Sequence, residues 1–424
     1  MKYSIMKNSC KNTFFTSFFC KSFYILFLFI SLSCSNMKDK SKIVPIFSFD
    51  IGYDEKELGL VNEVIHQEQK NINYCYSNGF YFISDRINNK ILKVTESGEI
   101  LLTIFNKINY PVIAENTGNT DNNQTSDVDY LILYSEYNLM SPGLISADNE
   151  KNIFIINSNP DYKKLKNNVV EDKIILKFNP NGILEFELGR NGINTEPFGY
   201  IISMKNDVDN NLVIIEKMND GFQIYKFSSQ GTLILKSTIT LKNIPLLKNE
   251  ISYIISFVDI RSDYRENEIY ITCQFASKET TMMLETYSIE YEKIYLYSLK
   301  ENKISKMLLK INQEYEDLSK FKLNQDITEL YGDKKSIAKP FQSIIGLDNV
   351  NNIYLFQKEI PFQSITANNQ YIMKYLETGK LSKTSFVEFE KNALFVNNYY
   401  LTNDGRIITY IIKEDKINFV KILL

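Results

Sequence analysis

The chain of 424 residues has no tryptophan and only one histidine, five cysteines and nine prolines. Because His66 stands alone, no HExxH motif, Cys/His cluster or Ser–His–Asp arrangement can be built around it with any specificity. A single histidine at a strand or loop position is more often structural than functional. The sequence also has no glycine-rich loop of the kind that cradles phosphate groups. These absences argue against zinc chemistry, triad hydrolysis and nucleotide binding through such a loop.

A long hydrophobic segment is missing as well. The longest apolar run, FYILFLFISLSC (23–34), follows a start that carries four lysines. Its core of about ten apolar residues is shorter than the about 20 that a membrane-spanning helix needs. This organisation is typical of a secretory signal, so residues 1–33 are excluded from the fold.

The end of this run resembles the cleavage box of bacterial lipoproteins, in the relaxed form found in spirochaetes, because Ser31, Leu32 and Ser33 precede Cys34. The resemblance implies that Cys34 becomes the first residue and carries diacylglycerol and acyl lipid such as palmitate. Residues 34–42 would then be a lipidated tether, and the protein would be anchored in the cell envelope, in the outer membrane. The alternatives are an uncleaved signal anchor and a plain secretory signal.

The remaining composition is that of an exported globular protein, with 44% hydrophobic and 23% charged residues. Removal of residues 1–33, which hold four lysines and no acidic residue, lowers the net charge from −3 to −7. We therefore expect no general attraction to nucleic acid. With Cys34 lipidated, only Cys75 and Cys273 remain, which is too few for a disulfide framework.

The stretch ISDRINNKILKVTESGEI (83–100) belongs to a pattern that recurs along the chain. Its first half is a turn of Asn, Asp or Gly followed by an apolar run, and six copies begin at residues 77, 150, 209, 266, 350 and 403. Its second half is an alternating strand that ends in a turn, and six copies begin at residues 89, 172, 222, 292, 370 and 416. With the strand before and the strand after, each unit predicts a four-stranded antiparallel meander.

Such a sheet needs neighbours to cover its faces, and a closed ring of sheets supplies them. Six units of about 50 to 60 residues predict an all-β, six-bladed propeller as one domain over residues 43–424. NGFYFISDRINNKILKVTESGEIL (78–101) resembles an NHL repeat, and the other units keep its rhythm but not its letters. A β-sandwich of generic strands is the alternative.

The last unit has three strands, so its fourth must come from elsewhere. IVPIFSFDIG (43–52) follows the tether and is predicted to close the last blade, with the region of Ile46 beside Val420. This pairing would clasp the ring and place the lipid anchor next to the last blade.

Four insertions decorate the units. Residues 115–130 predict a polar loop, and 161–173 a solvated hairpin tip. In a long loop at 276–292, the triplet Met282, Met283 and Leu284 is a candidate partner contact, with packing against the blade as the alternative. Tyr315, Leu318 and Phe321 have helical spacing and form a second candidate contact, as a short helix within 312–335 over one face, with a linker packed on the ring as the alternative.

One enzymatic hypothesis depends on resemblance to six-bladed lactonases and arylesterases, which imply calcium in the central tunnel. Asp148, Asp207, Asp259 and Asp348, together with Asp209, are expected at turns after the innermost strands and are candidate ligands. Asn152, Asn210, Asn211 and Asn351 lie beside them. The alternative is that these side chains bind their own turn backbone.

The preferred hypothesis is a non-catalytic scaffold: an envelope lipoprotein that offers a loop-covered face to other envelope proteins and has no cofactor besides its lipid. A propeller lipoprotein of different repeat type in the outer-membrane protein assembly machinery suggests that machinery as a partner, on grounds of architecture and anchoring alone. The competing hypothesis is a calcium-dependent lactonase or esterase in the tunnel.

Overall fold

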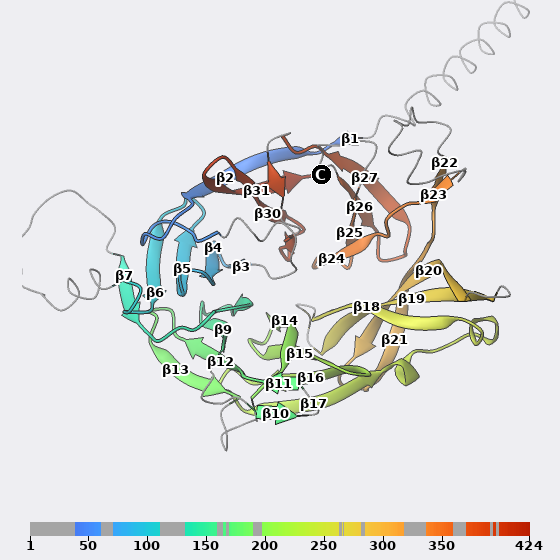
Figure 1. The fold of residues 1–424 in the computed structure, drawn as a ribbon, viewed down its shortest axis with the longest axis horizontal. Coiled ribbons are helices and arrows are strands. Elements are labelled where there is room, and N and C mark those ends of the chain that lie inside the picture. The colour runs from blue at the N-terminus through green and yellow to red at the C-terminus, as the bar shows by residue number, and fades with distance from the viewer. Residues whose placement is uncertain are drawn as a thin grey trace, which may run out of the picture.

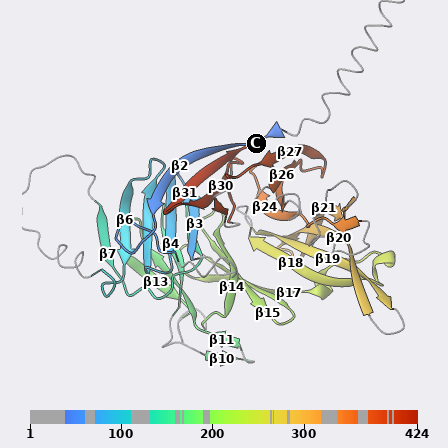
Figure 2. The same ribbon diagram turned by 45° about the horizontal axis from the view of Figure 1, so that its top comes forward.

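The computed structural model describes residues 39–60, 71–110, 132–158, 164–166, 169–189, 197–262, 265, 267–280, 285–317, 336–358, 370–390, 393–395 and 398–424. Six β-sheets stand around a central axis, as Figure 1 shows face-on and Figure 2 shows tilted. In these residues the helical elements are the short 3-10 turns η4 (Leu241–Asn243) and η5 (Lys248–Glu250). The predicted six-bladed β-propeller is confirmed.

Each blade is numbered here from the chain start, and its strands run from the axis outward. Blade 1 holds β3 (Ile72–Ser77), β4 (Phe80–Asp85), β5 (Lys90–Thr95), β6 (Ile100–Phe105) and β7 (Leu133–Glu136). Blade 2 holds β8 (Ile145–Ala147), β9 (Ile153–Ser158), β12 (Lys173–Phe178) and β13 (Leu184–Leu188). Blade 3 holds β14 (Tyr200–Asn206), β15 (Leu212–Met218), β16 (Gly221–Phe227) and β17 (Leu233–Thr240).

The later blades follow the same order. Blade 4 holds β18 (Ile254–Ser262), β19 (Glu268–Thr280), β20 (Glu285–Ser298) and β21 (Lys303–Asn312). Blade 5 holds β24 (Ser343–Leu347), β25 (Ile353–Lys358), β26 (Gln370–Tyr375) and β27 (Leu381–Val387), with β1 (Asp39–Lys40) added at its outer edge. Blade 6 holds β28 (Leu394–Phe395), β29 (Tyr400–Leu401), β30 (Ile407–Lys413), β31 (Lys416–Leu423) and β2 (Lys42–Asp50).

The ring closes as expected, because the start of the chain supplies the outer strand of blade 6. Strand β2 pairs antiparallel with β31, and Pro45 lies opposite Val420. Ile46 is the extra residue of a β-bulge in this ladder. The preceding β1, within the predicted tether, pairs in parallel with β27 of blade 5. The segment 39–50 therefore joins the outer edges of two neighbouring blades.

Lys90 fixes the turn that follows β2 to blade 1. Its fully buried Nζ donates hydrogen bonds to the carbonyl oxygens of Asp54 (2.7 Å), Glu55 (3.0 Å) and Glu57. Burial lowers the pKa of Lys90 to about 8, against the opposing effect of the carboxylates around it. We call β2 and the turn that follows it the clasp. The clasp is thus held to blade 6 by backbone pairing with β31 and to blade 1 by the buried Lys90.

The core is divided among the junctions between blades. Six clusters of buried apolar side chains are present among the described residues, and each draws its members from two neighbouring blades. The apolar faces that a single four-stranded sheet would expose are therefore covered by the neighbouring blades. This arrangement is why the repeat had to close into a ring.

The insertions differ from expectation in two places. Most of the predicted loop 276–292 is strand, because β19 and β20 pair up to Thr280 and Glu285 in a long hairpin. The extra strand β7, which pairs in parallel with β6, was not predicted. Within 161–173, the hairpin of β10 (Lys164–Lys166) and β11 (Val169–Glu171) agrees with the prediction. The predicted loop at 115–130 lies outside the described residues.

Candidate functional site

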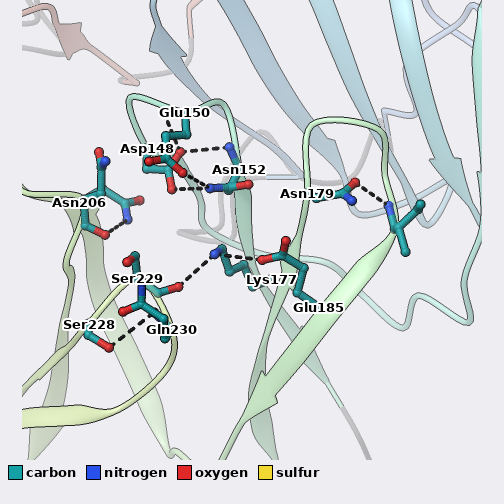
Figure 3. Close-up of polar contacts among 12 residues, drawn as sticks. Asp148, Glu150, Asn152, Lys177, Asn179, Glu185, Asn206, Ser228, Ser229 and Gln230 are labelled. Carbon is teal, nitrogen blue, oxygen red and sulfur yellow. Dashed lines mark hydrogen bonds and ion pairs between the residues drawn. The ribbon is translucent and has the colours of Figure 1, made fainter.

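Three of the predicted calcium ligands form one repeated turn between the first and second strands of blades 2, 3 and 5. Asp148 Oδ1 accepts hydrogen bonds from the backbone N–H groups of Glu150 and Asn152, both at 2.9 Å (Figure 3). Its Oδ2 accepts from Asn152 Nδ2 at 2.7 Å. Asp207 and Asp348 make the same contacts in 207–211 and 348–352.

The fourth residue of each turn has a left-handed backbone. Its φ is 69° at Lys151, 64° at Asn210 and 65° at Asn351. Blade 6 builds the same turn with Thr402, whose hydroxyl accepts from Arg406 N at 2.9 Å, and with Gly405 at φ 82°. The alternative interpretation of these Asp and Asn residues, that they bind their own turns, agrees with this geometry.

The inner ends of the blades are linked to one another around the axis. Every junction between neighbouring blades carries at least one hydrogen bond. From the junction of blades 1 and 2 round to that of blades 6 and 1, these hydrogen bonds are Asn78 Nδ2 to Asn149 O (2.7 Å), Asn149 N to Asn210 Oδ1 (3.0 Å), Ser203 Oγ with Ser262 Oγ (3.2 Å), Arg265 to Asn351, Asn349 N to Asn403 O (2.8 Å) and Tyr400 OH to Tyr76 O (3.0 Å). We call this circuit the inner-turn ring.

The donor set does not fit calcium. Each turn carboxylate is already occupied by its own turn, and Asp207 Oδ2 also contacts Lys226 Nζ at 2.8 Å. Asp259 does not lie at a turn as predicted: it lies within β18, paired with Thr272, and its Oδ2 accepts from Arg261 Nε at 2.8 Å. Across the described part of the chain, no group of three or more His, Cys, Asp or Glu residues is placed to hold a metal ion. Calcium binding needs six to eight oxygen ligands around one point.

A cavity of about 250 Å³ opens at the inner-turn ring, between blades 1, 2, 3 and 6. Its wall carries Lys205 and Arg406 together with the turn residues. Arg406 is bound on several sides, by Asp404 at 2.9 Å, Tyr76 OH at 3.2 Å and Glu96 at 3.4 Å. Although burial favours the neutral form, Asp404 and Tyr76 raise the pKa of Arg406. This guanidinium therefore links blades 6 and 1.

The predicted partner contacts are only partly described. Tyr315 is 56% exposed and lies in β22 (Tyr315–Asp317), which pairs with β23 (Ser336–Ala338). The predicted helix is wrong at this residue, because pairing with Ala338, 23 residues further along the chain, overrides the helical spacing. Leu318, Phe321, Met282, Met283 and Leu284 lie outside the described residues, as do His66 and Cys34.

A groove that was not predicted lies between blades 3 and 4. Its volume is about 600 Å³, and its apolar lining comes from both blades and includes Tyr200, Met218, Leu241, Phe257 and Val258. Four of these are substantially exposed: Tyr200 at 60%, Val258 at 51%, Met218 at 41% and Leu241 at 40%. Polar and charged residues, among them Lys217, Asp220 and Lys242, complete the lining. The adjoining connection 241–251 exposes Leu246, Leu247 and Ile251. The only sequence signal was the unusual density of apolar residues in 244–260.

Comparison with known proteins gives a likeness of fold. No family model and no curated protein matches the chain. A gluconolactonase of Xanthomonas campestris is 8% identical, with a TM-score of 0.39 over 89% of this chain and 98% of that chain. A luciferin-regenerating enzyme is 7% identical, with a TM-score of 0.38 over 91% and 95%. A Bacteroides fragilis protein described as exported is 10% identical, with a TM-score of 0.41 over 92% and 98%.

Identities this low and TM-scores below 0.5 give no ground for assigning an activity to this chain. A search of the described residues for helices that are long and apolar enough to cross a membrane finds none. The functional argument therefore depends on the surfaces of the ring itself.

Proposed function

We propose that the protein is a non-catalytic, lipid-anchored scaffold of the cell envelope, and that the groove between blades 3 and 4 binds an extended segment of a partner protein. The observation that carries this proposal is the groove itself, in which several large apolar side chains are exposed next to one another. Exposed apolar side chains that gather in a groove with polar residues around them are typical of a surface that meets a partner. The hydrolase alternative has no such support, since Asp148, Asp207 and Asp348 are occupied by their own turns and Asp259 is bound by Arg261.

The form of the partner follows from β18, which makes the groove wall with Ile255, Phe257 and Val258. Within the described chain, β18 pairs with β19 on one edge only. Its other edge offers backbone N–H and C=O groups to an added strand. Because side chains of an added strand alternate, every second one would enter the groove. An extended apolar segment of another envelope protein suits both features.

The clasp supports membrane anchoring close to the ring. Only four residues lie between Cys34 and Asp39, the first residue of β1, so the two are five steps apart along the chain. A chain of that length reaches at most about 18 Å. A lipid on Cys34 would therefore hold the propeller against the membrane by the outer edges of blades 5 and 6.

Site-specific photo-cross-linking in the native cell tests the partner surface. A cross-linker at Met218 in the groove should trap one envelope protein, with subunits of the outer-membrane assembly machinery as the first candidates. A cross-linker at Ile183, which is 62% exposed on the turn between β12 and β13, is the control and should not trap it. The purified partner should bind the wild type, and Leu241→Asp, which changes a side chain that lines only this groove, should weaken that binding about tenfold or more because it buries a charge. Equal binding by the variant would contradict the proposal.

Two further measurements test the anchor and the absence of catalysis. Metabolic labelling with a palmitate analogue should mark the wild type but not Cys34→Ala, which should leave the membrane fraction. Elemental analysis of chelator-washed protein should find no stoichiometric calcium. Labelling that persists in Cys34→Ala would contradict the anchor, and one bound calcium per chain would favour the hydrolase.

A further inference from the structure

A second cavity, of about 260 Å³, lies between blades 4 and 5. Strands β18 and β19 form one wall and β24 and β25 the other, while Tyr399 of blade 6 adds to the lining. At about 30 Å³ per water, this is roughly the space of nine water molecules. It lies close to the lower limit of about 300 Å³ for pockets that hold small molecules.

Two buried polar side chains in this cavity have hydrogen-bonding capacity to spare. Gln342 is 8% exposed, and its Oε1 accepts from Tyr375 OH at 3.0 Å. No hydrogen bond from its Nε2 is found among the described residues, and none is found for the hydroxyl of Thr272, which is 4% exposed. Neither atom is among the fully enclosed side-chain atoms that lack a partner, so both face the space of the cavity. Buried polar groups in folded proteins are nearly always satisfied. Both groups are therefore available for hydrogen bonds with whatever occupies the cavity.

The same wall presents opposite charges next to each other. Asp259 and Arg261 are two residues apart on β18 and both line the cavity. A β-bulge at Val258, where β18 gains a residue against β19, sets the side of the strand on which they lie. Their contact uses only Asp259 Oδ2 and Arg261 Nε, at 2.8 Å. The second carboxylate oxygen and the terminal guanidinium nitrogens keep their capacity for a ligand.

We propose that this cavity binds a small zwitterion, an α-amino acid with an apolar side chain. Its carboxylate would accept paired hydrogen bonds from the terminal nitrogens of Arg261, the geometry in which guanidinium binds carboxylates best. Its ammonium would donate to Asp259 Oδ1, with Thr272 and Gln342 supplying further hydrogen bonds. Val258, Ile344 and Phe356, which complete the lining, match an apolar side chain.

A ligand with a single charge fits less well. An anion alone would leave Asp259 close to its carboxylate, and a cation alone would meet Arg261. A neutral apolar molecule would offer no hydrogen bond to Gln342 Nε2 or to the Thr272 hydroxyl. The adjacent charges and these two groups together select a molecule that carries both signs.

Titration calorimetry and thermal unfolding of the purified protein with each of the 20 common amino acids test the proposal. Leucine, methionine or phenylalanine should bind and raise the melting temperature. The N-acetyl and carboxamide derivatives of the best ligand, each lacking one charge, should bind about tenfold more weakly or worse, since a charged hydrogen bond is lost. If no amino acid binds at about 10 mM, or if the blocked derivatives bind equally well, the proposal is wrong.

Matched variants locate the site. Thr272→Val and Arg261→Gln should each weaken binding about tenfold while thermal unfolding confirms that the variant is folded. Ser256→Ala, on the same strand but lining the groove between blades 3 and 4, should bind as the wild type does. If Arg261→Gln does not fold, Thr272→Val decides the matter alone. Unchanged binding by Thr272→Val would overturn the assignment, and the partner-binding groove would be unaffected by that result.

Discussion

Phe47 of β2 lies opposite Phe419 of β31, with ring centroids 4.8 Å apart, although the two residues come from opposite ends of the chain. The Phe419 ring also lies within 6.5 Å of Phe49 and within 5.3 Å of Tyr74 in blade 1. One buried aromatic side chain thus joins the clasp strand, the last blade and the first blade. The closure of the ring is concentrated at this point.

Truncation of this ring should open the clasp. We expect Phe419→Ala to lower the free energy of unfolding by about 3–5 kcal/mol, because a fully buried aromatic side chain is replaced by a cavity. Urea denaturation followed by circular dichroism measures the change. Asn418→Ala, the neighbouring and partly exposed position on β31, should change stability by less than about 0.5 kcal/mol. Equal effects of the two variants would show that the clasp does not hold the ring.

The clasp could be predicted because its signal is local. An isolated apolar strand at 43–52 and a last unit with only three strands leave one pairing that removes both free edges. The turn aspartates could be predicted for the same reason, since Asp148, Asp207 and Asp348 occupy the first position of a five-residue turn that recurs in the sequence. Because the turn recurs, these aspartates could be aligned with one another and assigned the same position in each repeat.

The wrong predictions concern residues whose position is determined by contacts with segments distant in sequence. Asp259 resembled a turn residue, but the bulge at Val258 and the pairing with β19 keep it within a strand. Tyr315 had helical spacing, but its pairing with Ala338 makes it part of a strand. The groove and the cavity each need two blades, and no pattern within one repeat describes the space between neighbours. The fold could therefore be predicted from the sequence, but the groove and the cavity could not.

Asp207 and Asp148 should differ in sensitivity although they occupy equivalent turns. Asp207 is fully buried against Lys226, whose side chain is 3% exposed. We expect Asp207→Asn to cost about 3–5 kcal/mol, because a buried cation loses its carboxylate counter-charge. Asp148→Asn keeps the turn and should cost about 1 kcal/mol.

Urea denaturation of both variants, and of Asp207→Asn combined with Lys226→Met, checks this difference. Removal of the buried ammonium group in the double variant should recover a large part of the lost stability. Equal destabilisation by the two single variants would indicate that the carboxylate acts through its turn alone.

Glu292 should make stability depend on pH. It is 2% exposed in blade 4, and burial raises its pKa to about 7, with Gln274 opposing and Asp259 adding to the effect. Between its ordinary pKa of 4.5 and about 7, the folded protein holds a proton that the unfolded chain has released. The contribution of Glu292 to stability is therefore full below pH 4.5 and is lost as the pH rises through 7.

Glu292→Gln should remove this dependence. The variant should be more stable than the wild type at about pH 8, by up to about 3 kcal/mol, and its unfolding free energy should vary less between about pH 5 and 8. Urea denaturation at a series of pH values measures both slopes. Glu290→Gln, at an exposed position on the same strand, should keep the wild-type slope. Parallel slopes for Glu292→Gln and the wild type would contradict the assignment.

Glu250 should hold the groove between blades 3 and 4 in shape. It lies in η5, on the connection that borders the groove, and is 2% exposed. Its Oε1 accepts hydrogen bonds from Tyr291 OH at 2.9 Å and from Lys293 Nζ, and its Oε2 accepts from Leu247 N at 3.0 Å. Burial favours the neutral acid, but Lys293, Leu247 and Tyr291 together lower the pKa of Glu250.

We expect Glu250→Gln to cost about 3–5 kcal/mol, because Lys293 stays buried without its counter-charge. Limited proteolysis should cut the variant within 241–254, where the wild type resists, and binding of the cross-linked partner should fall with it. Lys248→Gln, an exposed position in the same η5 turn, should leave both unchanged. Cleavage of the wild type and of Glu250→Gln at equal rates would show that the buried ion pair does not hold this connection, and the groove would then owe its shape to β14 and β18 alone.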